Sequence, residues 1–207
     1  MGRVGAMRIG IFGGTFDPPH LGHLILAAEA YHQLKLEKLL FVLTSDPPHK
    51  QDILISPFPE RLAMLEAAIA DNPTFALSRV EVDRPGPHYT VDTMRLLKKE
   101  YPGDTLIYLM GGDSLRDLLV NWHKPDEFIQ ACDVIGVMRR PQDRIDLESL
   151  EAAIPGISAK VEFMNAPLLE IAARQIRRRV AEGRPYRYYL PDSVYQIIQK
   201  KKLYQTK

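Results

Sequence analysis

The amino-acid sequence predicts an α/β protein with an open, mostly parallel sheet that carries helices on both faces. Short apolar runs of strand length alternate along the chain with segments in which apolar residues recur at helical spacing. This alternation favours right-handed strand–helix–strand crossovers and parallel neighbouring strands. The chain has 207 residues, of which 45% are hydrophobic. That length and composition fit one domain with a single sizeable core.

The first apolar run, residues 7–12, is expected to be a buried strand. Gly13 and Gly14 are expected to break this strand, and the two prolines that follow preset the backbone for a helix start. Apolar residues at helical spacing then predict a helix over residues 21–34. The first unit is therefore a strand, a glycine turn and a helix.

The rest of the chain continues the alternation. Further strands are expected at residues 38–44, 75–82, 105–110, 133–138 and 159–164. Further helices are expected at residues 57–70, from 90, just after 111, at 126–131, within 142–155, at 174–181 and at 193–200. Thr90 or a neighbour is the expected N-cap of its helix, and Asp192 or Ser193 that of the closing helix, because short polar side chains accept hydrogen bonds from the first N–H groups.

Composition limits the classes of function. The net charge is +1, which argues against a nucleic-acid coat or a membrane-surface protein. Cys132 is the only cysteine, so an intrachain disulfide is excluded and a reducing cytoplasm is the expected location. The sequence shows no signal peptide and no apolar run of the roughly 18 residues that a spanning helix needs. Residues 1–6 are interpreted as a tag remnant or an upstream start, and residues 7–207 as one domain with a small C-terminal helical part.

The glycine turn before the first helix carries the functional pattern. Such a turn exposes backbone N–H groups at the positive end of a helix dipole, which suits an anion such as phosphate. His20 and His23 are three residues apart, so both face the same side of the first helical turn. The glycines form neither the G-x-G-x-x-G dinucleotide fingerprint nor a P-loop, which needs a lysine followed by serine or threonine. These residues predict a polyphosphate site.

The stretch Gly-Gly-Thr-Phe-Asp-Pro-Pro-His-Leu-Gly-His, residues 13–23, is similar to the H-x-G-H signature of the nucleotidylyltransferase superfamily. In this form it resembles bacterial nicotinate-nucleotide adenylyltransferases, and the resemblance covers nearly all of residues 7–203. It implies a Rossmann-like fold. It also implies a reaction in NAD biosynthesis that joins ATP to nicotinate mononucleotide and releases pyrophosphate.

The resemblance implies an ATP site around the two histidines. His20 is expected nearer the leaving group and His23 nearer the α-phosphate, and neighbouring phosphates are expected to favour their charged form. The expected catalytic residues are His20, His23 and Arg177. Asp113 lies at the end of an expected strand, where open α/β sheets place ligands and where a carboxylate suits ribose hydroxyls. The other residues expected at ATP are Gly13, Gly14, Thr15, Phe16, Gly111, Ala172 and Arg174.

The acceptor nucleotide is expected at a second set of residues. The helix start at Tyr89 and Thr90 offers backbone N–H groups to the nicotinate carboxylate, and Trp122 offers a ring face to the cationic pyridine. A plain cap for Thr90 and a core position for Trp122 are the alternative interpretations. The stretch around Thr90 also resembles a family motif, in which His88 replaces a serine. The other residues expected at the acceptor are Asp17, Thr44, His49, Lys50 and Arg139.

The chain departs from its family at the second phosphate motif. That motif usually reads I-S-S-T-x-I-R, whereas residues 171–177 here read Ile-Ala-Ala-Arg-Gln-Ile-Arg. Arg177 is kept, but all three hydroxyl positions are changed. We predict that Arg174, one turn before Arg177, substitutes electrostatically for the lost hydroxyls. The alternative is a solvated Arg174 and a weakened site.

No carboxylate cluster has metal-binding spacing, so Mg²⁺ is expected to arrive with the ATP phosphates. ATP and nicotinate mononucleotide are the expected partners, with neither nucleic acid nor membrane, and self-association into a homo-oligomer is left open. Two other classes of function remain. One is an enzyme of the same fold that acts on nicotinamide mononucleotide or pantetheine phosphate, and the other is a nucleotide sensor without turnover.

Overall fold

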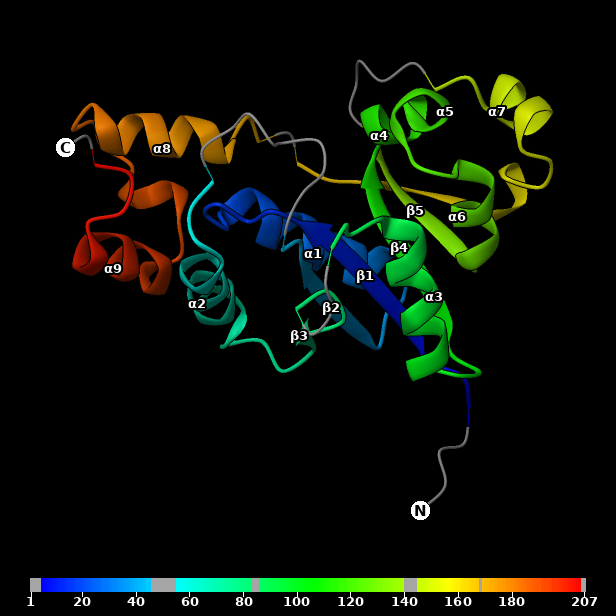
Figure 1. Ribbon diagram of the computed structural model, residues 1–207, viewed down its shortest axis with the longest axis horizontal. Coiled ribbons are helices and arrows are strands. Elements are labelled where there is room, and N and C mark those ends of the chain that lie inside the picture. Colours follow the sequence, from blue (N-terminus) through cyan, green and yellow to red (C-terminus); the bar gives the residue numbers. More distant parts are fainter. Residues whose placement is uncertain (1–4, 46–54, 83–85, 140–144, 168, 206–207) are drawn as a thin grey trace.

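Six parallel strands form one sheet in the order β3-β2-β1-β4-β5-β6 (Figure 1). The computed structural model describes residues 5–45, 55–82, 86–139, 145–167 and 169–205. The strands are β1 (Arg8–Gly14), β2 (Lys38–Leu43), β3 (Phe75–Ser78), β4 (Thr105–Gly111), β5 (Val134–Arg139) and β6 (Val161–Asn165). The order reverses at β1, because the chain winds outward through β2 and β3 and then returns to place β4 on its other side. Ligands bind open α/β sheets at such a reversal, beyond the carboxyl ends of the strands.

Helices cover both faces of the sheet, as the sequence predicts (Figure 1). One face is covered by α1 (Leu21–Gln33), α2 (Phe58–Ile69), α8 (Ala173–Ala181) and α9 (Asp192–Lys201), with the 3-10 turn η2 (Arg187–Tyr189). The other is covered by α3 (Thr90–Glu100), α4 (Gly112–Arg116), α5 (Leu118–Asn121), α6 (Pro125–Ala131) and α7 (Leu147–Ala153), with the 3-10 turn η1 (Ser158–Lys160).

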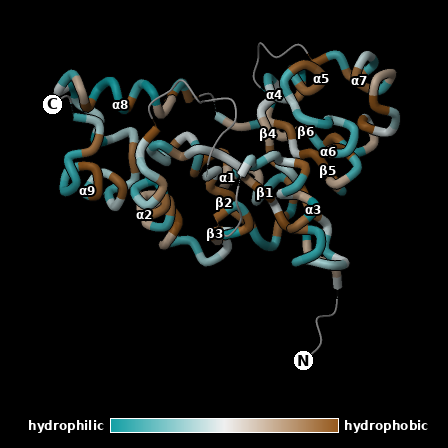
Figure 2. The backbone as a smooth tube through the Cα atoms, in the orientation of Figure 1, coloured by the Kyte–Doolittle hydropathy of each residue, from teal (hydrophilic) through white to brown (hydrophobic). Residues whose placement is uncertain are grey.

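The core consists of two apolar layers, one on each face of the sheet. Along β2, Leu39, Phe41 and Leu43 join the layer under α1 and α2, whereas Leu40 and Val42 join the layer under α3. A strand buried on both faces is apolar at every position, which explains its unbroken run in the sequence. Figure 2 shows the same contrast, with hydrophobic strands in the middle of the molecule and a largely hydrophilic α8 at its edge.

The ends of β1 and β3 differ from the sequence prediction. The glycines do not break β1, because Gly13 and Gly14 pair in parallel register with Val42 and Leu43. The strand ends at Gly14, and two residues later Phe16 has a φ of 46°, which lies outside the extended region. β3 ends at Ser78 rather than residue 82, because the chain turns there with Val82 N–H donating to Arg79 O at 2.8 Å.

Of the two expected helix caps, the first lies within the prediction and the second differs from it. Tyr89, the neighbour of Thr90, is the N-cap of α3, and its side chain makes no capping hydrogen bond. Pro191 is the N-cap of α9, with Asp192 as the first helical residue. Ser193 instead donates its hydroxyl to Ala67 O on α2 at 2.8 Å. A tertiary contact therefore takes the hydroxyl that local preference assigns to a cap.

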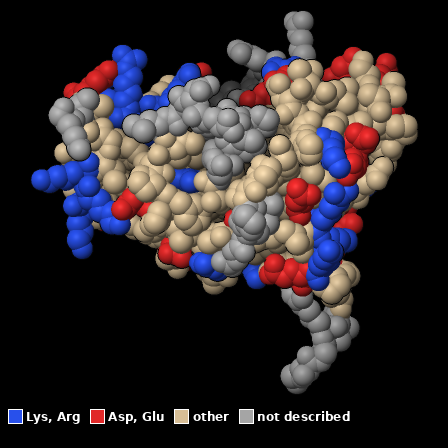
Figure 3. Space-filling model, in the orientation of Figure 1, with Lys and Arg blue, Asp and Glu red and all other residues tan. Residues whose placement is uncertain are grey.

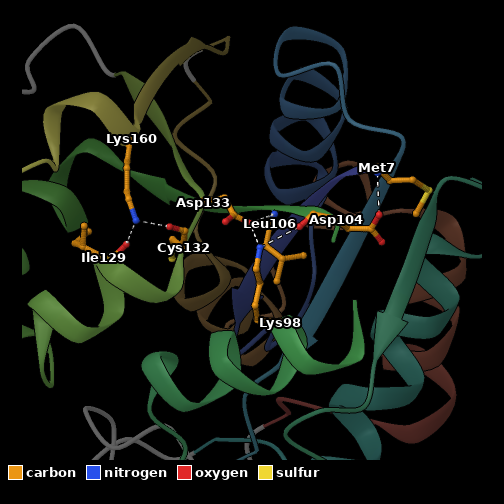
Figure 4. Close-up of polar contacts among 8 residues, drawn as sticks. All are labelled: Met7, Lys98, Asp104, Leu106, Ile129, Cys132, Asp133 and Lys160. Carbon is orange, nitrogen blue, oxygen red and sulfur yellow. Dashed lines mark hydrogen bonds and ion pairs between the residues drawn. The ribbon is translucent and has the colours of Figure 1, made fainter. Parts of the chain in front are cut away.

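Polar contacts close the amino ends of the central strands (Figure 4). Lys98 on α3 donates to Asp104 O at 3.1 Å and also binds the Asp133 carboxylate. Lys160 donates to the backbone oxygens of Ile129 and Cys132 at 2.8 and 2.7 Å. The Cys132 thiol beside this cluster is 1% exposed, and burial raises its pKa. It is therefore an inert buried thiol at the sheet edge opposite the carboxyl ends.

Within the described residues, no helix is long and apolar enough to cross a membrane.

Candidate active site

The loop that follows β1 is shaped by the packing of Phe16. A Cβ atom on Gly14 would lie 2.9 Å from the Phe16 ring, so only glycine fits beneath it. The ring itself packs edge-on against Phe12 at a centroid distance of 5.6 Å and belongs to the core. The sequence interpretation places Phe16 at ATP. In the structure its side chain is 3% exposed and anchors the loop from within.

His20 and His23 meet at the amino end of α1. Their rings stack with centroids 3.7 Å apart and an interplanar angle of 23°. His20 is the N-cap residue, and its backbone N–H donates to His23 Nδ1 at 3.2 Å. A neutral His23 ring that accepts at Nδ1 carries its proton on Nε2, which makes Nε2 the donor atom. Local helix geometry thus fixes the tautomer of His23.

Burial controls the charge of His20 in the free protein. Its side chain is 5% exposed, and desolvation lowers its pKa to about 4. The sequence interpretation of the charge of His20 considers only neighbouring phosphates, which favour the charged imidazole. It does not include the effect of burial. At neutral pH His20 is therefore neutral in the free protein, and this avoids placing two stacked cations 3.7 Å apart.

Gly22 gives the His20 ring its space. A Cβ atom at this position would lie 3.1 Å from His20 Nδ1 and 3.2 Å from Cε1, so the ring would have to shift. We expect Gly22→Ala to lower kcat about tenfold, because misplacing a catalytic group by 1 Å costs up to about 10²-fold. The melting temperature should not fall, because alanine is favoured over glycine within a helix. An equal loss of kcat from Gly22→Ala in wild-type and His20→Ala backgrounds would show that the His20 ring is not involved.

A first cavity of about 360 Å³, here called the glycine cavity, lies beyond the ends of β1 and β2. It is lined by residues predicted from the sequence on both the ATP and the acceptor side: Gly13, Gly14, Thr15, Thr44, Tyr89, Thr90 and Trp122. Trp122 packs edge-on against Tyr108 and at a tilt against Phe128, with centroid distances of 5.9 and 4.8 Å. The Trp122 ring therefore both contacts the core and lines the cavity, and its contact with the acceptor stays a prediction.

A second cavity of about 880 Å³, here called the histidine cavity, lies beyond β4 and β5. It is lined by His20, His23, Asp113 and Ala172 of the sequence-predicted ATP set, and by Arg139. The sequence interpretation places Arg139 at the acceptor. In the structure it lines this cavity, with its guanidinium 3.8 Å from the centre of the Phe163 ring. Gly111 leaves room for the Asp113 carboxylate, since a Cβ atom at position 111 would lie 2.4 Å from Asp113 Oδ1.

The Asp17 side chain is hydrogen-bonded to other residues of the chain and lines neither cavity. Its carboxylate is 3% exposed and accepts hydrogen bonds from Ser56 N–H at 3.0 Å and from the Tyr204 hydroxyl at 2.6 Å. Arg177 donates from Nη1 to Asp17 O at 2.6 Å, so it holds the loop that leads to His20. The sequence interpretation of Asp17 as an acceptor ligand does not anticipate this network. His49 and Lys50 lie outside the described residues.

Further residues with polar side chains line a cavity but are not among the site residues expected from the sequence. The glycine cavity is also lined by Glu81, His88, Thr93 and Tyr108. Glu81 is buried and accepts from the Thr93 hydroxyl at 2.5 Å. Burial raises the pKa of Tyr108, so its hydroxyl stays protonated. Position 88 carries one usable signal, because His88 stands in a motif that otherwise matches the family.

Arg174 lies in the segment where the chain departs from the second phosphate motif of its family. Ala172 and Ala173 line the histidine cavity at the start of α8, whereas Arg174 is exposed and lines neither cavity. Figure 3 shows lysine and arginine side chains gathered at the end of the molecule that α8 and α9 form. In the free protein Arg174 therefore lies outside both cavities, and its substitution for the lost hydroxyls stays a prediction.

We expect Arg174→Ala to raise the KM for ATP about threefold or more, and Arg177→Ala to raise it further, because charge-assisted contacts to phosphate are the strong ones. Ala173→Ser should change the KM little. Steady-state kinetics with varied ATP measure the effect. Arg178→Ala, which removes an exposed arginine paired with Glu182 at 2.6 Å, is the matched control. Unchanged ATP kinetics in Arg174→Ala, with a clear improvement in Ala173→Ser, would instead indicate a weakened site.

Comparison with known proteins places the chain in a family. The family model described as cytidylyltransferase-like matches residues 11–180. The chain is 47% identical over 199 residues to a probable nicotinate-nucleotide adenylyltransferase of Thermomicrobium roseum, covering 96% of this chain and 92% of that protein. It is 41% identical over 198 residues to a protein of the same name from Thermus thermophilus, covering 96% and 100%.

Solved structures share the fold. A Plasmodium falciparum nicotinic acid mononucleotide adenylyltransferase complexed with NaAD superimposes with a TM-score of 0.75 at 20% identity, covering 96% of this chain and 97% of that one. The same enzyme complexed with APC gives a TM-score of 0.74 at 19% identity, with the same coverage. The sequence identities, the coverage and the shared sheet together establish that this chain belongs to the nicotinate-nucleotide adenylyltransferase family.

Proposed function

We propose that this protein joins ATP to nicotinate mononucleotide and releases nicotinate adenine dinucleotide and pyrophosphate, as a step of NAD biosynthesis. The observation that carries the proposal is the stacked pair of His20 and His23 at the amino end of α1. This pair lies at the reversal of the strand order, and the β1–α1 unit contributes residues to both cavities. Two ligands can therefore meet at one helix end that attracts phosphate.

The histidine cavity suits ATP. It is the larger of the two cavities and combines both imidazoles, the Asp113 carboxylate and the start of α8. Helix ends and imidazole N–H groups suit the triphosphate, and a carboxylate at the end of a central strand suits ribose hydroxyls. Because His23 Nδ1 accepts a hydrogen bond from the backbone, His23 Nε2 is the atom that can donate to a phosphate oxygen. When triphosphate enters, its negative charge acts against the burial that keeps His20 neutral.

The glycine cavity suits the acceptor nucleotide. Tyr89 and Thr90 bring the amino end of α3 to its wall, and Trp122 brings an aromatic ring. A helix start favours the nicotinate carboxylate, and an aromatic face favours the cationic pyridine ring. The segment Gly13 to Thr15 forms the side of this cavity that leads toward the histidines.

The reaction needs positioning and charge stabilisation more than a base. An oxygen of the acceptor phosphate attacks the α-phosphorus of ATP and forms the new P–O bond, while the bond to the β-phosphate oxygen breaks and its electron pair leaves with pyrophosphate. The attacking phosphate is already an anion, so no proton has to be removed. Donors at the α-phosphate and at the leaving group stabilise the charge that builds up in the transition state.

A protein-built metal cage does not fit the described part of the chain. Among those residues, no group of three or more histidine, cysteine or carboxylate side chains is placed to hold a metal ion. Mg²⁺ keeps several waters and commonly binds through substrate phosphates. We propose that any Mg²⁺ enters with ATP. A cytoplasmic location and self-association stay predictions of the sequence.

One assay tests the function against its alternatives. Pyrophosphate release is measured with ATP and, in turn, nicotinate mononucleotide, nicotinamide mononucleotide and pantetheine phosphate. We expect nicotinate mononucleotide to give the highest kcat/KM. Release that is fastest with pantetheine phosphate or the amide identifies an enzyme of the same fold with another acceptor. Nucleotide binding by calorimetry without release of pyrophosphate identifies a sensor and overturns the proposal.

A further inference from the structure

Arg61 on α2 is a buried charged side chain. It is 2% exposed and heads the largest fully buried side chains of the described residues. It lies on the same face of α2 as Met64, Leu65 and Ala68, which are all buried. Burial lowers its pKa, and the nearby Asp17 carboxylate acts against that shift. A guanidinium at an otherwise apolar helix position is unusual, since buried charges are costly unless they are fully hydrogen-bonded.

The guanidinium is bound by backbone oxygens from separate segments of the chain. Nη1 donates to Thr44 O at 2.7 Å and to Thr15 O at 3.1 Å. Nη2 donates to Ser45 O at 2.9 Å, and Nε donates to Ser56 O at 3.0 Å. Thr15 directly follows β1, whereas Thr44 and Ser45 directly follow β2. One planar group therefore joins the two strand ends and the segment that leads into α2.

These two strand ends form walls of the glycine cavity. Thr15 and Thr44 both line it, whereas neither residue lines the histidine cavity. Arg61 lines neither cavity, so it acts from behind the wall. Asp17 reinforces the same junction, because its carboxylate accepts from Ser56 N–H at 3.0 Å while Ser56 O accepts from Arg61. The fork geometry of a guanidinium fixes the relative positions of its acceptors, which a lysine ammonium cannot do.

We propose that Arg61 is a positioning residue that sets the spacing of Thr15 and Thr44 and thereby the shape of the acceptor site. The proposal rests on the proposed function, which places the acceptor nucleotide in the glycine cavity. Arg61 touches neither substrate. It holds the backbone of the residues that do, and its effect should therefore appear as a change in acceptor recognition.

The test replaces Arg61 in two ways. Arg61→Lys keeps the charge but loses the fork, and Arg61→Met keeps a side chain of similar length but removes both the charge and the hydrogen bonds. We expect either variant to raise the KM for nicotinate mononucleotide about tenfold or more, the effect of one to two lost hydrogen bonds to a charged group. The KM for ATP should change less than about twofold, because none of the oxygens bound by Arg61 belongs to a residue of the histidine cavity.

Arg8→Lys is the matched control. Arg8 is also partly buried, donates from Nε to Leu34 O at 2.9 Å and pairs with Glu162 at 2.8 Å, but it lies at the amino end of β1, away from both cavities. This variant should lower the melting temperature without changing either KM. Acceptor binding measured by calorimetry without ATP provides a second readout that needs no turnover.

The outcomes separate the two proposals. Wild-type activity with nicotinate mononucleotide decides the function, and the variants relative to wild type decide the role of Arg61. A lower active fraction with both KM values unchanged, or an equal rise in both, overturns the positioning role. If Arg61→Lys does not fold, Arg61→Met carries the test. If neither folds, Arg61 serves the fold as a whole and the proposal is wrong.

Discussion

Replacing His23 with alanine is expected to lower kcat by about 10²–10³-fold, the cost of losing one donor aimed at transition-state charge. The structure sharpens the reason. His23 Nδ1 is occupied by the backbone N–H of His20 at 3.2 Å, so we expect Nε2 to be the atom that donates to the α-phosphate. The KM for ATP should rise much less than kcat falls, because the charge on the α-phosphate grows as the transition state forms.

Single-turnover and steady-state rates of His23→Ala, measured with saturating ATP, check this effect. His32→Ala is the matched control, because His32 is an exposed imidazole in the last turn of the same helix. A kcat within threefold of wild type in His23→Ala would exclude the assigned role. A loss in His23→Ala that is accompanied by an equal loss in His32→Ala would indicate damage to α1.

The second large effect concerns the acceptor. We expect nicotinate mononucleotide to be preferred over nicotinamide mononucleotide by about 10–100-fold in kcat/KM, because an amide NH₂ placed against backbone N–H donors leaves a mismatch of roughly 1–3 kcal/mol. Tyr89 and Thr90 supply those donors on the wall of the glycine cavity. Glu81 lines the same cavity and acts in the opposite direction, since its charge repels a second carboxylate. Its side chain is turned to the Thr93 hydroxyl at 2.5 Å, and we therefore expect the helix start to dominate.

The preference is measured by pyrophosphate release with each acceptor at several concentrations. Trp122→Ala should weaken acceptor binding and leave ATP binding nearly intact, because an aromatic face over a cation contributes about 0.5–2 kcal/mol. Trp122→Phe is the control that keeps an aromatic ring against Tyr108 and Phe128. Equal kcat/KM values for acid and amide contradict the assignment. A preference for the amide would indicate that the Glu81 carboxylate accepts a hydrogen bond from the amide NH₂ group.

Some features of the site follow from the sequence because they are local. The spacing of His20 and His23 places both imidazoles on one turn of any helix that starts there, and their rings do stack at 3.7 Å. Asp113 follows an apolar strand and therefore reaches the carboxyl edge of the sheet, where it lines the histidine cavity. Such predictions succeed because the geometry of one element fixes the relative positions of its own residues.

Other features needed the fold. The sequence predicts a strand at residues 133–138. Where Arg139, at the end of this strand, lies in the site depends on which strands are its neighbours in the sheet. The structure places Arg139 over Phe163 of β6, on the histidine cavity. Burial is a second such quantity, because the low pKa of His20 arises from packing around the ring and not from its neighbours in sequence.

The sequence by itself determined the alternation of strands and helices, the parallel sheet and the histidine pair, because hydrophobic periodicity and short spacings encode them. Only the tertiary structure decided that Asp17 is held by Tyr204, 187 residues further along the chain, and that Arg61 binds Thr15 O across a separation of 46 residues. These contacts form between segments whose meeting depends on the packing of the whole sheet and its helices. The spacing within one helix therefore fixes the histidine pair, whereas the contacts that hold the surrounding loops in place join parts of the chain that are distant in the sequence.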